Sequence, residues 1–194
     1  MVDDYKTHIS DVQKDLILLW KEMKSGKFKY PQTVSKRKWV YYKNKPPSAT
    51  RAFVGFGCSF GGKWFSSYAG DYCKANADYC KRTRDSLKKM EKSIKKINRI
   101  YCKSYDKWET KGCLIYCDPP YENTNKYYAV DKFDSKKFWD NVRRWSKHNI
   151  VIVSEFKAPK DFVCIWSKDK VTNWGENKPC KITEKLFIHK KNKK

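Results

Sequence analysis

A short apolar run that ends in two consecutive prolines constrains the fold of this chain more than any other segment. Leu114–Cys117 reads as a buried strand within an expected strand 113–117, and Asp118 follows it directly. Pro119 and Pro120 have no backbone N–H, so they end the pairing and leave the Pro119 carbonyl oxygen directed outward. A helix is expected over 135–147 and a strand over 150–154. Strand, helix and strand at this spacing predict a parallel α/β sheet.

The residues that follow the strand are suited to bind an amine that is conjugated to a ring. Asp118 stands at the carboxyl end of its strand, where open α/β sheets bind ligands. Its carboxylate and the Pro119 carbonyl are two acceptors beside the aromatic ring of Tyr121. Two acceptors on the hydrogens of adenine N6 or cytosine N4 favour the geometry in which the nitrogen attacks a methyl donor. Tyr121 is expected to stack on a base turned out of the duplex. The alternative is a plain Pro-Pro turn.

The net charge of the chain predicts a polyanionic partner. Lys and Arg number 44 against 21 Asp and Glu, which gives a formal net charge of +23. This excess is far beyond what solubility requires, and nucleic acid is the partner it favours. The alternative is a lysine-rich surface that reflects coding bias. A membrane surface is disfavoured because no apolar stretch reaches the roughly 18 residues of a membrane span.

Length and cysteine usage bound the class of protein further. A chain of 194 residues is expected to form a single domain, 1–194. Its first residues lack the apolar stretch of a signal peptide, which predicts an intracellular, reducing compartment and leaves cytoplasm or nucleus open. The eight cysteines are then expected to be thiols. No Cys-x-x-Cys pair occurs and the three histidines are scattered, so no metal site is expected.

The amino-terminal segment 7–20 reads as the end of a strand that turns into a helix. Ser10 and Gln13 are spaced as a capping box, and the helix is expected to stop near Gly26. Asp11 lies between the two elements, where an acidic side chain can accept hydrogen bonds from a ribose. A helix-capping role explains an acidic residue there equally well.

The segment 27–100 is expected to be a helical insertion that contacts DNA. One helix is predicted over 35–42 and a strongly basic one over 71–97. The basic helix carries an apolar stripe of Leu87, Met90, Ile94 and Ile97. Its cationic outer face is either simply solvated or follows DNA phosphates.

Between these helices, 52–65 is too rich in glycine for a regular element to be expected. It does not follow an apolar strand, so it is not interpreted as a cofactor-binding glycine loop. Its aromatic and basic side chains suggest a DNA-binding surface, with core packing as the alternative; they are Phe56, Phe60, Lys63, Trp64 and Phe65. The candidate DNA-binding residues over the whole chain are Lys63, Trp64, Arg82, Lys126 and Tyr127. Further strands are expected over 99–102, 162–166 and 184–188.

These motifs resemble those of adenine-specific DNA methyltransferases of the DNA adenine methylase type, particularly the short forms of phages and large viruses. The segment 115–121, with Thr124 and Tyr127, is similar to the family's catalytic motif, and 154–162 resembles a segment that follows it. The segment 9–12 resembles the motif whose acidic residue contacts the ribose of S-adenosylmethionine. The resemblance implies a Rossmann-like methyltransferase sheet, S-adenosylmethionine as cofactor and double-stranded DNA as partner. It also implies catalytic roles for Asp118, Pro119, Pro120 and Tyr121, and cofactor contacts from Asp11 and Asp118.

The sequence departs from that family at its front. Members usually carry a glycine loop on a first strand ahead of the acidic motif, whereas ten residues precede Asp11 here. The expected sheet therefore lacks its first strand and glycine loop, and Ser104 stands where an aspartate is expected. One hypothesis is an active adenine-N6 methyltransferase. A second is a split or decayed form that only binds DNA, or that needs a second polypeptide to supply the loop. A third is methylation of cytosine N4 or a glutamine side chain, where Ser or Asn more often replaces Asp118.

Overall fold

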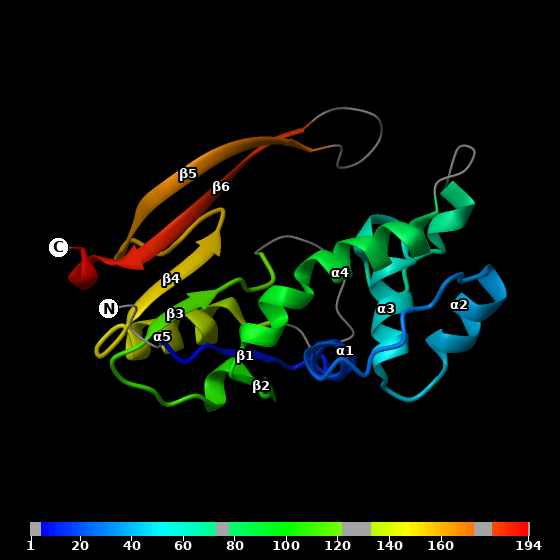
Figure 1. The fold of residues 1–194 in the computed structure, drawn as a ribbon. Coiled ribbons are helices and arrows are strands. Elements are labelled where there is room, and N and C mark those ends of the chain that lie inside the picture. The colour runs from blue at the N-terminus through cyan, green and yellow to red at the C-terminus, as the bar shows by residue number, and fades with distance from the viewer. Residues whose placement is uncertain (1–4, 73–77, 122–132, 173–179, 194) are drawn as a thin grey trace. The chain divides into compact units, whose positions relative to one another are not determined.

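The computed structural model of the protein divides into two compact units. Residues 1–105 with 126–131 form the first unit, and residues 106–125 with 132–194 form the second. The structure describes residues 5–72, 78–121, 133–172 and 180–193 (Figure 1). Each unit has its own elements and core and is described by itself; the expectation of one domain over 1–194 stays a prediction.

The described part of the first unit combines a pair of parallel strands with four α-helices. Strand β1 (His8–Asp11) pairs in parallel with β2 (Arg99–Cys102), so that Ile9 lies opposite Ile100. The helices between the two strands are α1 (Lys14–Lys24), α2 (Lys36–Lys43), α3 (Ala49–Gly57) and α4 (Tyr79–Lys96). The predicted strand 99–102, the strand-to-helix turn and the helix over 35–42 are confirmed.

The capping box expected at the start of α1 is wrong. The Ser10 hydroxyl instead donates to the Lys103 carbonyl at 2.5 Å, across to the end of β2. Gln13 caps the helix, and its side-chain oxygen accepts from the Asp15 N–H at 3.2 Å. The Gln13 N–H in turn donates to Asp11 Oδ1 at 2.7 Å. Pairing of β1 with β2 thus takes Ser10 away from the helix terminus.

The expectation that 52–65 holds no regular element is also wrong, because α3 occupies its first part. Ser48 caps α3 by accepting from the Arg51 N–H at 3.1 Å. Its glycines serve close packing: a Cβ on Gly55 would lie 2.5 Å from the ring of Trp64, and one on Gly57 would lie 2.2 Å from Thr83 Cγ2. The missing side chains therefore let neighbouring elements approach the α3 backbone.

Helix α4 begins later than the sequence pattern predicts. Asp78 caps it by accepting from the Lys81 N–H at 2.9 Å, whereas Ala69–Tyr72 forms a short 3₁₀ turn. Ile94 is buried, but Met90 is 46% exposed and does not belong to the buried stripe. The expected cationic outer face is present, with exposed Lys81, Arg82, Lys88, Lys89, Lys92, Lys95 and Lys96.

Gly57→Ala is expected to destabilise the first unit by about 1–3 kcal/mol, because the added methyl group overlaps Thr83. Urea unfolding followed by circular dichroism measures the loss. Thr83→Ala removes the overlapping Cγ2 atom, so the double variant is expected to lose less than the sum of the two single variants. Strict additivity would contradict this account of Gly57.

The core of the first unit forms where α1, α2, α3 and α4 meet. Trp39 Nε1 donates to the Ser59 hydroxyl at 2.9 Å, and that hydroxyl donates to the Gly55 carbonyl at 2.7 Å. The buried apolar residues are Leu19, Met23, Phe28, Val34, Trp39, Ala49, Ala52, Phe53, Val54, Cys58, Phe65, Cys80 and Ile94. Phe65 is therefore a core residue and not part of a DNA-binding surface.

In its described residues, the second unit has a four-stranded sheet and one α-helix. Its elements are β3 (Leu114–Cys117), α5 (Ser135–Trp145), β4 (Ile150–Glu155), β5 (Phe162–Thr172) and β6 (Cys180–His189). The strand order is β3-β4-β6-β5; β3 and β4 are parallel, and the other two pairs are antiparallel. The predicted α/β class and the strand, helix and strand are confirmed. The whole sheet is mixed, and its last two strands are longer than expected.

The sheet is buried on the side that α5 covers. Phe138 and Val142 of α5, and Val151 and Val153 of β4, are all buried. The expectation that β3 is a buried strand is wrong, since Leu114 is 70% exposed and Tyr116 is 61% exposed. Successive side chains of a strand point to opposite faces, and these two lie on the face opposite to the α5 side.

Candidate active site

The Asp-Pro-Pro-Tyr motif lies at the end of β3, tied to the end of the neighbouring strand. Because β3 and β4 are parallel, both carboxyl ends lie at the same edge, with Cys117 opposite Val153. The Tyr121 and Ser154 hydroxyls are 2.6 Å apart and hydrogen-bonded. The Tyr121 ring meets Phe156 edge-on, with ring centroids 4.6 Å apart and planes at 80°. The segment after β3 and the end of β4, which are far apart in sequence, are thus in direct contact at this edge of the sheet.

Asp118 carries a carboxyl group whose pKa is raised above the ordinary value for aspartate. Partial removal from water is the largest cause, and the negative charge of Glu184 adds to it. A hydrogen bond with the Tyr121 hydroxyl acts in the opposite direction by stabilising the carboxylate. The pKa of Asp118 is raised because the ionised carboxylate is less well solvated here than it would be in water.

The Tyr121 hydroxyl has a defined donor and a defined acceptor role in its two hydrogen bonds. Burial raises the pKa of Tyr121 to about 12, so the phenol keeps its proton at neutral pH. A carboxylate can only accept, hence Tyr121 donates to Asp118 and accepts from Ser154. Ser154 and Tyr121 are therefore successive donors in a hydrogen-bonded chain that ends on the Asp118 carboxylate.

The backbone at the motif offers a second acceptor. No described residue donates a hydrogen bond to the Pro119 carbonyl oxygen. Glu155 closes β4 nearby; it is buried, and its Oε1 accepts from the Phe156 N–H at 2.7 Å. Burial raises the pKa of the Cys117 thiol to about 12, which makes this cysteine a poor nucleophile. The available groups are thus acceptors and aromatic rings.

Asp11 belongs to the first unit and lies at the carboxyl end of β1. Its Oδ1 accepts from the Gln13 N–H, in agreement with the alternative role in the turn before the helix. That bond uses one of its two carboxylate oxygens. A carboxylate at the end of a parallel strand pair fits a ribose diol, so the residue suits a nucleoside cofactor while also shaping its own turn.

The candidate DNA-binding residues fall into three situations. Lys63 is half-buried at the end of a short 3₁₀ turn, and Arg82 is exposed on α4. Trp64 is half-buried, with its ring centroid 4.7 Å from that of Phe56 and 5.0 Å from the Arg51 guanidinium. These contacts favour the packing alternative for Trp64. Lys126 and Tyr127 lie outside the described residues.

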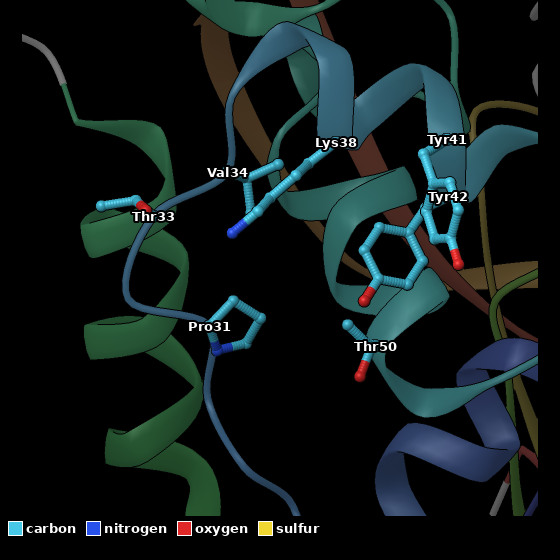
Figure 2. Close-up of a pocket in the computed structure, with 7 residues that line it drawn as sticks. All are labelled: Pro31, Thr33, Val34, Lys38, Tyr41, Tyr42 and Thr50. Atoms are coloured by element: carbon cyan, nitrogen blue, oxygen red, sulfur yellow. The ribbon is translucent and has the colours of Figure 1, made fainter.

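A cavity of about 170 Å³ in the first unit contains none of the expected site residues. It is lined by Pro31, Thr33, Val34, Lys38, Tyr41, Tyr42 and Thr50. Figure 2 shows the Lys38 amine and the Tyr42 hydroxyl directed toward the space between segment 31–34 and α3. Within the described ranges, no group of three His, Cys, Asp or Glu side chains is arranged to hold a metal ion. None of the helices described there has the length and apolar character to cross a membrane.

Three residues of the candidate active site were not singled out from the sequence. Ser154 and Phe156 lie at the end of β4, and the rule that parallel strands share an edge would have placed them beside Asp118. Glu184 acts on both Asp118 and Tyr121 through its charge. Its position follows from the register of β6, for which the sequence carries no local signal.

The second unit is an α/β unit in which an Asp-Pro-Pro-Tyr motif ends a parallel strand, and its two acceptors beside an aromatic ring are suited to an exocyclic amine. Comparison with known families narrows the choice among such amines. The D12 class N6 adenine-specific DNA methyltransferase family matches residues 62–181, and the chain belongs to this family. The match contains α4 and the Asp118 motif, whereas Asp11 precedes it. No curated protein matches the chain. Membership confirms the resemblance, supports methylation of adenine in DNA, and implies S-adenosylmethionine as the methyl donor.

Proposed function

We propose that this protein methylates adenine N6 in double-stranded DNA at a specific sequence, with Asp118 and the Pro119 carbonyl oxygen as acceptors for the amine. The observation that carries the proposal is the chain Ser154, Tyr121, Asp118 at the shared edge of β3 and β4 in a member of this family. The donors hold the carboxylate in place, and the adjacent carbonyl oxygen accepts no bond from a described residue.

The chemistry of these groups fits an amine that becomes positively charged. Two acceptors on the N6 hydrogens draw the lone pair out of conjugation with the ring, and the carboxylate stabilises the positive charge that develops on nitrogen. Bound S-adenosylmethionine supplies a methyl group already activated by its sulfonium. The task of Asp118 and Pro119 is therefore orientation and electrostatic stabilisation.

The aromatic rings of the candidate active site supply contacts for the base. A base inside the duplex cannot present its amine to a carboxylate, so the target adenine has to leave the stack. We expect the rings of Tyr121 and Phe156 to pack against it, and the hydroxyl bond to Ser154 to hold the Tyr121 ring in position. Asp11 is proposed to bind the cofactor ribose, and Asp118 is proposed to contribute to cofactor binding. A second polypeptide that supplies a glycine loop stays a prediction.

The test is transfer of tritium from labelled S-adenosylmethionine to unmethylated duplex DNA, followed by digestion to nucleosides and chromatography. Label is expected in N6-methyladenine. Label in N4-methylcytosine would instead support the cytosine alternative. A folded protein that binds the duplex and transfers no label would contradict the proposal.

Tyr121→Phe is expected to lower kcat by about 5- to 10-fold, because the ring stays but the donor to Asp118 is lost. Tyr121→Ala loses the ring as well and is expected to lose considerably more. Ser154→Ala removes only the 2.6 Å bond and leaves the Tyr121 donor intact, so its kcat is expected to fall less than that of Tyr121→Phe. Equal rates for Tyr121→Phe and the unaltered protein would remove the role of the hydroxyl.

Methyl transfer is expected to fall on the acid side at a pH above the ordinary pKa of aspartate, about 3.9. Protonation of Asp118 removes an acceptor, and its raised pKa moves that loss to higher pH. The charge of Glu184 contributes to the raised pKa, so Glu184→Gln is expected to shift the acid limb of the kcat profile to lower pH. An acid limb that does not move in Glu184→Gln would contradict this cause.

A further inference from the structure

The hairpin of β5 and β6 extends beyond the sheet to which it belongs. Strand β4 pairs with β6 only from Lys185 to Phe187, whereas β5 and β6 stay paired as far as Thr172 and Cys180 (Figure 1). This outer part is a two-stranded ribbon, and residues 164–170 of β5 are all exposed. A two-stranded ribbon alone is at best marginally stable in water, so one with exposed side chains is suited to binding a partner.

One face of the ribbon continues the sheet face that carries the candidate active site. Ser154 lies opposite Leu186, and Leu186 lies opposite Trp166. Cross-strand partners and alternate residues share a face. That face therefore holds Trp166, Lys168 and Lys170 together with Glu184. Ser154 bonds to Tyr121, and the charge of Glu184 raises the pKa of both Tyr121 and Asp118. The ribbon face and the motif thus belong to the same side of the second unit.

The side chains of this ribbon face are aromatic and cationic. Trp166 is 45% exposed, and Lys168 and Lys170 are exposed. Lys170 pairs with Glu184 at 2.5 Å, and Lys168 lies directly opposite the same carboxylate. Two lysines and one acidic residue on this face leave a net positive charge. On the other face, Asp169 accepts from the Thr183 hydroxyl at 2.7 Å.

We propose that this ribbon face, Trp166, Lys168 and Lys170, binds the DNA beside the target adenine. The lysines neutralise phosphates, and the indole packs against a sugar or an unstacked base. A two-stranded ribbon has dimensions that the major groove admits. The choice of DNA as partner rests on the proposed function; the surface itself rests on the register, the exposure and the charges.

The test is duplex affinity by fluorescence anisotropy over a range of salt concentrations, without cofactor. Lys168→Gln/Lys170→Gln is expected to weaken binding about tenfold and to reduce the slope of log affinity against log salt by about 1.8, at about 0.9 per phosphate contact. Lys190→Gln/Lys191→Gln is the matched control, because it makes the same charge change at exposed residues after the other end of β6. The control is expected to keep the slope. Trp166→Ala is expected to weaken binding about tenfold at an unchanged slope.

Equal slopes for the ribbon variant and its control would overturn the proposal, as would affinity that all three variants leave intact. Circular dichroism and thermal unfolding check that each variant is folded. The DNA-binding proposal and the proposed function can each be contradicted without the other. Ribbon-dependent binding without N6-methyladenine would overturn the proposed function and leave the ribbon, whereas methyl transfer with ribbon-independent binding would overturn the ribbon alone.

Discussion

Asp118→Ala is expected to lower kcat for adenine methylation by about 100- to 1,000-fold, the cost of removing one preorganised charge-stabilising group. Asp118 accepts from Tyr121, and the Pro119 carbonyl that follows it accepts no bond from a described residue. Removal of the carboxylate leaves one acceptor for the amine and takes away the negative charge that Asp118 holds next to that acceptor. Single-turnover transfer of tritium to duplex DNA measures the chemical step directly.

One further variant separates the charge of Asp118 from its hydrogen bonding, and a second serves as the control. Asp118→Asn keeps an acceptor oxygen without the charge, so its rate is expected to lie between those of the unaltered protein and Asp118→Ala. Asp140→Ala is the matched control, because Asp140 is an exposed aspartate on α5 that pairs with Arg143. Duplex affinity is expected to remain unchanged in Asp118→Ala. A rate equal to that of the control would remove Asp118 from the mechanism.

Asp15→Ala is expected to destabilise the first unit by about 3–5 kcal/mol, the cost of leaving a buried charge without its partner. Asp15 is 2% exposed and accepts from the Ser48 N–H and from Arg51 Nη1, both at 2.9 Å. Arg51 also donates to the carbonyls of Tyr42 and Lys43. The aspartate thus connects α1 with the start of α3 and with the end of α2, and its loss affects all three helices.

Chemical unfolding followed by circular dichroism tests this expectation. Asp71→Ala is the control, because its ion pair with Lys36 is exposed and is expected to contribute about 0–1 kcal/mol. Arg51→Met removes the opposite charge, and the double variant Asp15→Ala/Arg51→Met is expected to recover part of the stability lost in Asp15→Ala. A loss in Asp15→Ala no larger than in Asp71→Ala would contradict the assigned role.

The elements that the sequence predicted well carry a local signal. The prolines at 119 and 120 mark the end of β3, and Ser35 caps the helix that was expected over 35–42. Helix α3 was missed because its glycines count against a helix locally. Their value comes from Trp64 and Thr83, which approach from later in the chain. The exposure of β3 was missed for a related reason, since an apolar run does not indicate how many of its faces are covered.

The sequence predicted the motif of the candidate active site, but only some of the residues that surround it. Asp118 and Tyr121 are adjacent to a recognisable strand, but their partners depend on sheet register. Ser154 lies on β4, which is parallel to β3. Glu184 lies on β6, which is antiparallel to β4 and is its next neighbour in the sheet. The Rossmann-like details and the absence of a first strand stay predictions. The cofactor role of Asp11 does so too, because its hydrogen bond to Gln13 serves the turn.

The hydroxyl chain from Ser154 through Tyr121 to Asp118 has a polarity, and that polarity reports the state of the carboxyl group. While Asp118 is ionised, the Tyr121 hydroxyl donates to it and the Ser154 hydroxyl donates to Tyr121. Once Asp118 takes up a proton it can donate, and the order of the protons can reverse as far as the end of β4. The phenolic C–O stretch of Tyr121, which differs between a donating and an accepting hydroxyl, would then serve as an infrared marker of Asp118 ionisation without any substrate present.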